Sequence, residues 1–101
     1  MKELLKPKTI AVIGASNHKS KVGYSLMENL RRFEGEVIPV NMHEKKILGK
    51  KCYKNILHIE KEVDLAIIAI PAPFVKQAVK ESRQKGVKAI IIISAGFSET
   101  G

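Results

Sequence analysis

Four short apolar runs divide the chain, and they constrain its fold more than any other feature. They are TIAVIG (residues 9–14), EVIPVN (36–41), DLAIIAI (64–70) and VKAIIII (87–93). Short runs of nearly continuous apolar residues are typical of strands that are buried on both faces of a sheet. Three crossover connections separate these runs, so we expect the strands to lie parallel with both faces of the sheet covered.

Two of the three connections have the apolar spacing of an amphipathic helix. Between residues 21 and 33, apolar side chains recur three or four positions apart, and Ser20 and Gly35 are placed to cap and to end the helix. Between residues 73 and 85 the same spacing returns. There Pro73 occupies the expected first helical position and Gly86 the stop.

The remaining connection is different in character. Residues 43–55 are basic and without periodicity, which predicts irregular structure, and residues 56–59 are expected to form one short helical turn. Pro39 within the second run indicates an edge strand, because proline cannot donate to a ladder.

These features predict one Rossmann-like α/β domain over residues 1–101, a doubly wound parallel sheet with the strand order 2-1-3-4. We expect right-handed crossovers and a topological switch point between the first and third strands, at their carboxyl ends. Three loops would converge there, at residues 14–21, 71–73 and 94–96. The fourth strand leaves an unfinished sheet edge, which makes self-association into a homo-oligomer a further expectation.

The charge balance favours an anionic partner. Eighteen Lys and Arg residues face ten Asp and Glu residues, for a net charge of +8. A lysine coat that only confers solubility is the alternative. The lysines are spread along the chain, we identify no basic stripe on a helix, and only five residues are aromatic. Sequence-specific nucleic-acid binding is therefore not expected.

Other bulk features point to the cytoplasm. A single cysteine excludes an internal disulfide, and the charged N-terminus lacks the apolar core of a signal peptide. No apolar run approaches the roughly 18 residues of a membrane span, so we expect no membrane partner.

The loop after the first run has the composition of a phosphate-binding turn. Gly14 allows a sharp turn, Ser16 can donate to an anion, and the helix that begins near Lys21 would direct its positive end to the same place. A plain turn without a ligand is the alternative.

The loop does not fit the common nucleotide fingerprints. The spacing Gly-x-Gly-x-x-Gly is absent, and the second strand ends in Asn41, Met42 and His43 rather than in an acid that would bind a ribose. The Gly-Lys-Ser/Thr signature of nucleotide hydrolases is absent too. The residues therefore favour a phosphorylated, adenine-containing ligand other than NAD.

Five segments, in this order, carry a family resemblance: VIGAS…KVGY, VIPVN, ILGKKCY, VDLAIIAIPAPFV and KGVKAIIIISAGFSETG. Together they resemble the CoA-binding domain that opens ADP-forming acetyl-CoA synthetases, the succinyl-CoA synthetase α subunit and some protein acetyltransferases. The resemblance covers residues 8–101. It implies coenzyme A or acyl-CoA as the ligand, and the long loop suits a molecule with roughly four negative charges.

The resemblance also implies which residues bind. The first group would line the phosphate loop: Gly14, Ala15, Ser16, Lys21, Val22 and Gly23. Asn41 and the residues that follow it would lie by the adenosine and its phosphates: His43 stands in the place of the family's lysine, and Lys46 is close enough along the chain to supply the charge. The remaining residues, Ile70, Pro71 and Ala72, and then Ile93, Ser94 and Ala95, would approach the nucleotide and the pantetheine arm. Pro71 could equally be a helix start, and Ser94 a turn residue.

The chain departs from the family at one position and lacks the family's catalytic parts. Where relatives commonly read Asn-Pro-Lys, this chain reads Asn41-Met42-His43, so the phosphate-binding lysine is replaced, although Lys45 or Lys46 could supply the charge. In the family, the phosphorylated histidine and the ATP site lie in other domains. We therefore expect no catalytic residue here, a chain truncated relative to the family, and the other synthetase domains or subunits as partners.

The remaining reactive side chains suggest no separate chemistry. The spacings of His18, His43 and His58 fit no common metal site, and Cys52 is expected to be a packed side chain. Two other functions stay open: an NAD(P)-binding Rossmann domain, and a non-catalytic interaction module that has kept the fold without the ligand.

Overall fold

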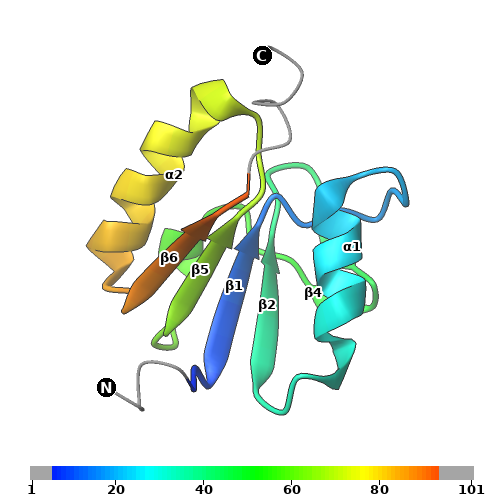
Figure 1. Cartoon of the computed structure of the whole chain (residues 1–101), viewed down its shortest axis with the longest axis horizontal. Coiled ribbons are helices and arrows are strands. Elements are labelled where there is room, and N and C mark those ends of the chain that lie inside the picture. Colours follow the sequence, from blue (N-terminus) through cyan, green and yellow to red (C-terminus); the bar gives the residue numbers. More distant parts are fainter. Residues whose placement is uncertain (1–5, 94–101) are drawn as a thin grey trace.

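Four parallel strands form the centre of the structure, a computed structural model that describes residues 6–93 (Figure 1). They lie in the order β2-β1-β5-β6. The strands are β1 (Thr9–Ile13), β2 (Glu36–Val40), β5 (Leu65–Ile68) and β6 (Ala89–Ile92). The predicted strand order and the doubly wound Rossmann-like class are therefore confirmed.

The helices cover opposite faces of this sheet. The α1 helix (Val22–Asn29) runs on into a 3-10 turn, η2 (Leu30–Arg32), and packs with Met27 on the face that holds Ile10 and Val12. The α2 helix (Ala72–Lys85) and the short turn η3 (Ile56–His58) lie on the other face. Ala78 is the centre of the buried stripe of α2 there.

The start of α1 differs from the prediction. Lys21, in extended conformation, is the N-cap residue, and no described side chain caps the helix, so the predicted cap by Ser20 is wrong. The reason is a turn just before the helix, in which the Lys21 N–H donates to the His18 carbonyl at 3.0 Å. This turn moves the first helical residue past Ser20.

The ends of α2 follow the sequence closely. The helix begins at Ala72, so Pro73 is its second residue rather than its first. Gly86 ends it in left-handed conformation, and its N–H donates to the carbonyls of Ser82 and Arg83. Residues 56–58 form the expected helical turn, which Asn55 caps by accepting a hydrogen bond from Leu57.

The basic connection after β2 is more regular than predicted. It contains a small antiparallel hairpin of β3 (Lys46–Ile47) and β4 (Lys50–Lys51). Leu48 and Gly49 both have positive φ, 49° and 82°, as the tight turn of a two-residue hairpin requires. Ile47 is completely buried against the α1 side of the sheet, which holds the hairpin in place.

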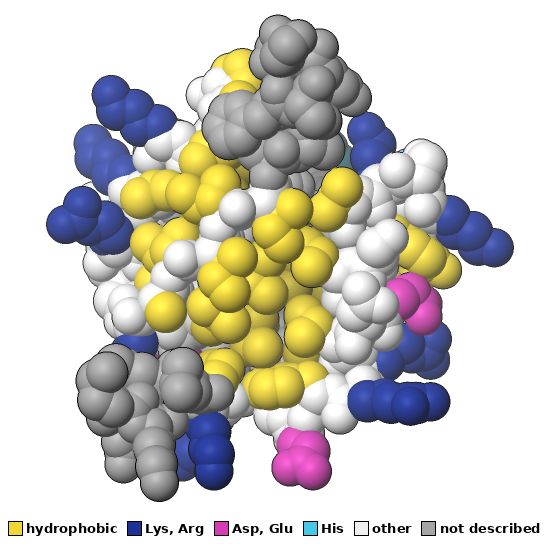
Figure 2. All heavy atoms as spheres, in the orientation of Figure 1, with side chains coloured by type: hydrophobic (Ala, Val, Ile, Leu, Met, Phe, Trp, Pro, Cys, Tyr) yellow, Lys and Arg dark blue, Asp and Glu magenta, His cyan; other side chains and the backbone are white. Residues whose placement is uncertain are grey.

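The expectation that both sheet faces are covered fails at β6 within the described residues. Ile91 and Ile92 are 46% and 47% exposed, and hydrophobic side chains gather over the strands on the face shown in Figure 2.

Among the described residues, no helix has both the length and the apolar character needed to cross a bilayer.

Candidate functional site

The carboxyl ends of the strands meet at one edge of the sheet, and both α1 and α2 begin there (Figure 1). We call it the carboxyl edge and define it by the loops of residues 14–21, 41–45 and 69–71. Two backbone bonds tie the first and third of these loops to the end of a neighbouring strand. The Gly14 N–H donates to Val40 at 2.9 Å, and the Ala69 N–H donates to Ile13 at 2.8 Å.

Gly14 and Gly23 bring the first loop and α1 into backbone contact. A Cβ on Gly23 would lie 1.8 Å from the carbonyl oxygen of Gly14. A Cβ on Gly14, whose φ is 95°, would lie 2.2 Å from the Ala69 oxygen and 2.8 Å from Ile70. Only residues without side chains allow this approach, and it places the first turn of α1 directly beside the ends of β1 and β5.

The loop between the two glycines is ordered by its own hydrogen bonds. Ala15 and Ser16 are buried, and the Ser16 Oγ accepts a hydrogen bond from the His18 N–H at 2.9 Å. The N–H groups of Val22 and Gly23, in the first turn of α1, have no intrahelical acceptor, and no side chain among residues 6–93 caps them. These donors and the positive helix end can therefore bind an anion.

Asn41 joins the first loop to the loop after β2. Its amide nitrogen donates to the Ala15 carbonyl at 2.8 Å. Its amide oxygen accepts from the His43 N–H at 2.7 Å and from the Glu44 N–H at 3.3 Å. The predicted site residue is thus at the carboxyl edge, but its side chain positions both loops and is engaged in doing so.

Asn17 has a similar part, which the sequence analysis missed. Its amide nitrogen donates to the Lys46 carbonyl at 2.9 Å, and its amide oxygen accepts from the Leu48 N–H at 3.0 Å. The β3–β4 hairpin is therefore fastened to the first loop. The only signal in the sequence was an amide side chain, with one donor and one acceptor end, inside a phosphate-type loop.

The predicted cationic residues lie on the surface of this region. Lys21, His43 and Lys46 are all exposed, and none takes part in an ion pair within residues 6–93. Lys21 is the N-cap residue of α1, and the backbone N–H of His43 is bound to Asn41. Lys46 begins β3 and meets the first loop through its carbonyl.

Some of the other predicted positions lie within residues 6–93 and some lie outside them. Ile70 lies against Gly14, Pro71 is the N-cap residue of α2, and Ala72 is its first helical residue. The Ile93 N–H donates to Ile68 at 2.8 Å and so continues the ladder past β6. Ser94 and Ala95 lie outside the described residues.

Cys52 is buried beneath this edge. Its thiol lies 3.7 Å from the carbonyl oxygens of Asn41 and Tyr53, and burial raises the pKa of the thiol. A buried thiol with a raised pKa is a packed side chain rather than a nucleophile, as expected. Within residues 6–93, no three His, Cys, Asp or Glu side chains lie close enough to hold a metal ion.

The charge distribution on α2 differs from the prediction that no helix carries a basic stripe. Lys76, Lys80 and Arg83 lie along one face of α2 and line a hollow of about 480 Å³ together with Val79 and Gln84. A short basic stripe therefore does exist on a helix. It lies on α2 beyond the first helical turn, away from the loops of the carboxyl edge.

The chain matches the family model of the CoA binding domain over residues 8–100. Among curated proteins, the chain is 52% identical over 96 residues to an ADP-forming acetate–CoA ligase II α subunit of Pyrococcus furiosus. That alignment covers 94% of this chain and 21% of the relative. An ADP-forming acetate–CoA ligase of Methanocaldococcus jannaschii is 46% identical over 101 residues, which are all of this chain and 14% of the relative. The chain thus spans about a fifth or less of these relatives.

Solved structures agree with this result. A Pyrococcus horikoshii protein superposes with a TM-score of 0.88 at 49% identity, covering 95% of this chain and 22% of that one. A dinucleotide-forming acetyl-coenzyme A synthetase of Candidatus Korarchaeum cryptofilum, solved with phosphate and ADP, superposes with a TM-score of 0.90 at 35% identity. It covers 99% of this chain and 22% of that one.

Proposed function

Because this chain belongs to the CoA binding domain family, we propose that its carboxyl edge binds coenzyme A or acyl-CoA. The pyrophosphate would lie at the first turn of α1, between Gly14 and Gly23. The observation that carries this proposal is the contact between those glycines. It places the first N–H groups of α1, which no side chain in the described part of the chain caps, at the junction of three loops.

The other family positions have roles that follow from where they lie. Lys21, His43 and Lys46 are exposed around the first loop, where they can attract the phosphates. Ala15, Ser16 and Val22 would contribute backbone around the pyrophosphate, and Asn41 would hold the two adjoining loops in register. Ile70, Pro71 and Ala72 would contact the nucleotide, and Ile93, Ser94 and Ala95 the pantetheine arm.

The same geometry disfavours NAD. A dinucleotide site of the usual kind needs a free carboxylate after the second strand to accept from the ribose hydroxyls. Here Asn41 occupies that point with its amide engaged. The nearest acid along the chain, Glu44, lies 3.4 Å from the Asn17 amide nitrogen. The ribose of NAD would therefore lack its acceptor.

The relatives extend the proposal to a larger reaction. They are named as ADP-forming acetate–CoA ligases, so we propose that this chain supplies the CoA-binding part of an acyl-CoA synthetase of that type. Its partners would be the remaining domains or subunits. Alone it would hold CoA without making acyl-CoA.

A thermal-shift comparison tests the ligand. CoA at a hundred times its dissociation constant should stabilise the fold by about 2.7 kcal/mol, whereas NAD should leave the melting temperature unchanged. Lys21→Ala should weaken the CoA effect, and Lys76→Ala, an exposed lysine on α2, is the matched control. An equal or larger shift with NAD would overturn the assignment. The absence of any shift would favour an interaction module.

A further inference from the structure

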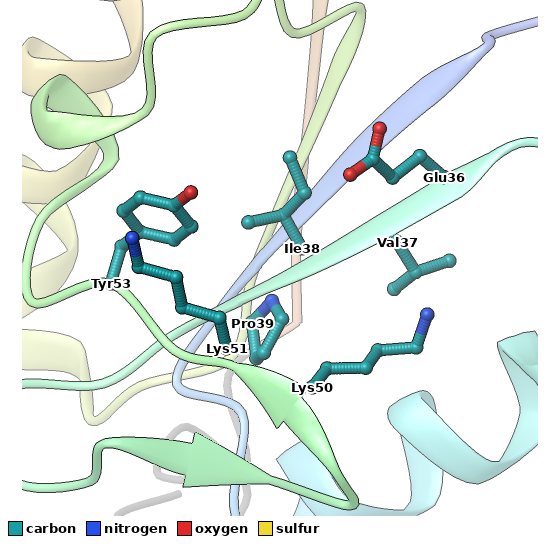
Figure 3. Close-up of a pocket in the computed structure, with 7 residues that line it drawn as sticks. All are labelled: Glu36, Val37, Ile38, Pro39, Lys50, Lys51 and Tyr53. Carbon is teal, nitrogen blue, oxygen red and sulfur yellow. The ribbon is translucent and has the colours of Figure 1, made fainter.

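A hollow of about 220 Å³ lies along the outer edge of β2, between that strand and β4 (Figure 3). We call it the β2 slot. It is lined by Glu36, Val37, Ile38, Pro39, Lys50, Lys51 and Tyr53. Val37 and Ile38 are only 5% and 4% exposed. Most of the accessible surface of the slot therefore belongs to its exposed residues, Glu36, Lys50 and Lys51.

The backbone groups of β2 alternate between two directions. The Glu36 N–H donates to Lys8, and the Val40 carbonyl accepts from Gly14, so residues 36, 38 and 40 bond toward β1. The backbone N–H and C=O groups of residue 37, and the C=O group of residue 39, therefore point away from β1. The Pro39 carbonyl accepts from Tyr53 at 3.0 Å, whereas the N–H and C=O of Val37 have no hydrogen-bond partner within the described residues.

Tyr53 pairs with the carboxyl-terminal end of the outer β2 edge and leaves the part at Val37 unpaired. It forms a parallel bridge with Val40, and its carbonyl accepts from the Asn41 N–H at 2.9 Å. Pro39 has no N–H to leave unpaired. The N–H donor and the C=O acceptor of Val37 thus remain without a partner among the described residues, and we call this unpaired residue of β2 the free strand position.

Positive charge surrounds this free strand position. The Lys51 ammonium lies 4.9 Å from the centre of the Tyr53 ring, and Lys50 extends toward Val37 (Figure 3). Lys50 forms no ion pair among the described residues, and the one acid at the slot, Glu36, is paired with Lys61. The unpaired charge of the slot is therefore cationic.

We propose that the β2 slot binds a short extended segment of a partner protein that carries a carboxylate side chain. The segment would pair with both backbone groups of Val37, as in strand addition to a sheet edge, and its carboxylate would lie by Lys50 and Lys51. A phosphate or a nucleotide fits less well, because it could accept from the Val37 N–H but would leave the Val37 carbonyl without a donor.

Amide chemical shifts of the full chain, with a synthetic peptide as the probe, test this inference. The probe is acetyl-Thr-Val-Glu-Val-Thr-amide, which has strand-forming residues and one carboxylate. We expect shifts at Val37, Ile38, Lys50 and Lys51, and unchanged shifts for residues 14–23. Saturating CoA should not compete, which separates this inference from the proposed function.

Variants of both molecules give matched controls. Lys50→Ala should weaken the peptide about fivefold, the upper range for an exposed charge pair, and Lys76→Ala on α2 should not. Replacing the peptide glutamate by glutamine should weaken it to a similar extent. Methylating the peptide nitrogens should abolish the shifts at Val37. The inference is overturned if the methylated peptide binds equally well, if Lys50→Ala has no effect, or if inorganic phosphate gives the same shifts.

Discussion

Gly14 and Gly23 explain how a loop longer than the common dinucleotide fingerprint can still bring a helix end to the strands. In the shorter fingerprint, separate glycines provide the turn, the approach to phosphate and the packing of helix on strand. Here Gly14 provides the turn with its φ of 95°, and Gly23 provides the packing, nine positions later. The residues between them can then widen the loop without moving the helix.

Gly23→Ala should show what this contact contributes. Its Cβ would meet the Gly14 backbone at 1.8 Å, and two backbones cannot move apart as a flexible side chain could. We expect the free energy of unfolding to fall by about 3 kcal/mol and CoA binding to weaken strongly. Urea denaturation measures the first and calorimetric titration the second. Ser25→Ala, on the exposed face of the same helix, should change stability by less than about 0.5 kcal/mol.

His43→Lys should tighten CoA binding a few-fold. A lysine restores a permanent charge where the family resemblance implies one, and an exposed charge contact contributes about 0.2–1 kcal/mol, at most about fivefold in affinity. Calorimetric titration at low and moderate salt should show the gain shrinking with salt. If the lysine variant binds no tighter while Lys46→Ala binds more weakly, then Lys46 already fills this role.

Asp64→Asn should destabilise the fold in a pH-dependent way. The Lys8 N–H donates to the Asp64 carboxylate at 2.8 Å and the Thr9 N–H at 3.1 Å, and Lys88 lies 3.4 Å away. The Lys8 bond is the largest cause that lowers the pKa of Asp64, with further lowering from Thr9 and Lys88. The carboxylate thus stabilises the fold above its unfolded pKa of about 3.9, and this contribution disappears as pH falls through the folded pKa.

The measurement is the difference in unfolding free energy between wild type and Asp64→Asn. We expect about 1–3 kcal/mol at pH 7, because bonds to a charged acceptor are lost, and a much smaller difference near pH 2. Glu60→Gln removes an exposed carboxylate and should change stability little at either pH. A difference that stays constant with pH would show that the charge of Asp64 is irrelevant.

At the scale of elements, the sequence predicted what periodicity and strong stop signals determine. The four strands, their order, η3 and the end of α2 at Gly86 follow from apolar runs and turn residues. The β3–β4 hairpin was missed because its strands are two residues long, too short for any period. Ser20 was mistaken for the cap because backbone hydrogen bonds of the loop, and not the local residue type, decide where α1 begins.

The candidate site was predictable to a lesser degree. The glycines could be located from their place after a strand, but the contact between them depends on how α1 packs on β1. Asn17 could not be found, because its partners lie 29 and 31 residues away in a hairpin that the sequence did not reveal. Whether each predicted residue contacts CoA stays a prediction.

Asn17→Ala should release the β3–β4 hairpin from the first loop. It removes the bonds to Lys46 and Leu48, and leaves their backbone groups to water. We expect a loss of about 1–2 kcal/mol in stability and faster hydrogen exchange at the Leu48 amide. Asn29→Ala, at the exposed end of α1, is the control. Unchanged exchange at Leu48 would mean that buried Ile47 alone fixes the hairpin.

At the scale of the whole molecule, cations surround the two regions that we propose bind ligands, and the basic stripe of α2 forms a third group. Lys21, His43 and Lys46 lie about the carboxyl edge, and Lys50 and Lys51 line the β2 slot. With a net charge of +8, the chain as a whole attracts anions at long range, and specificity has to come from backbone donors at each region. Electrostatic attraction and backbone recognition can therefore be separated by salt.

Raising sodium chloride from about 0.05 M to about 0.5 M should weaken CoA binding about tenfold, or about 1.4 kcal/mol, because the Debye length falls well below the size of the ligand. The cations proposed to meet the phosphates are exposed and form no ion pair within residues 6–93, so salt screens them strongly, whereas the helix-end donors keep part of the affinity. Dephospho-CoA, which lacks the 3′-phosphate, should bind more weakly at low salt and lose less on salt addition. Calorimetric titration of both ligands gives the two slopes. Equal slopes would show that the 3′-phosphate meets no cation of this chain, and the adenosine end would then have to lie away from His43 and Lys46.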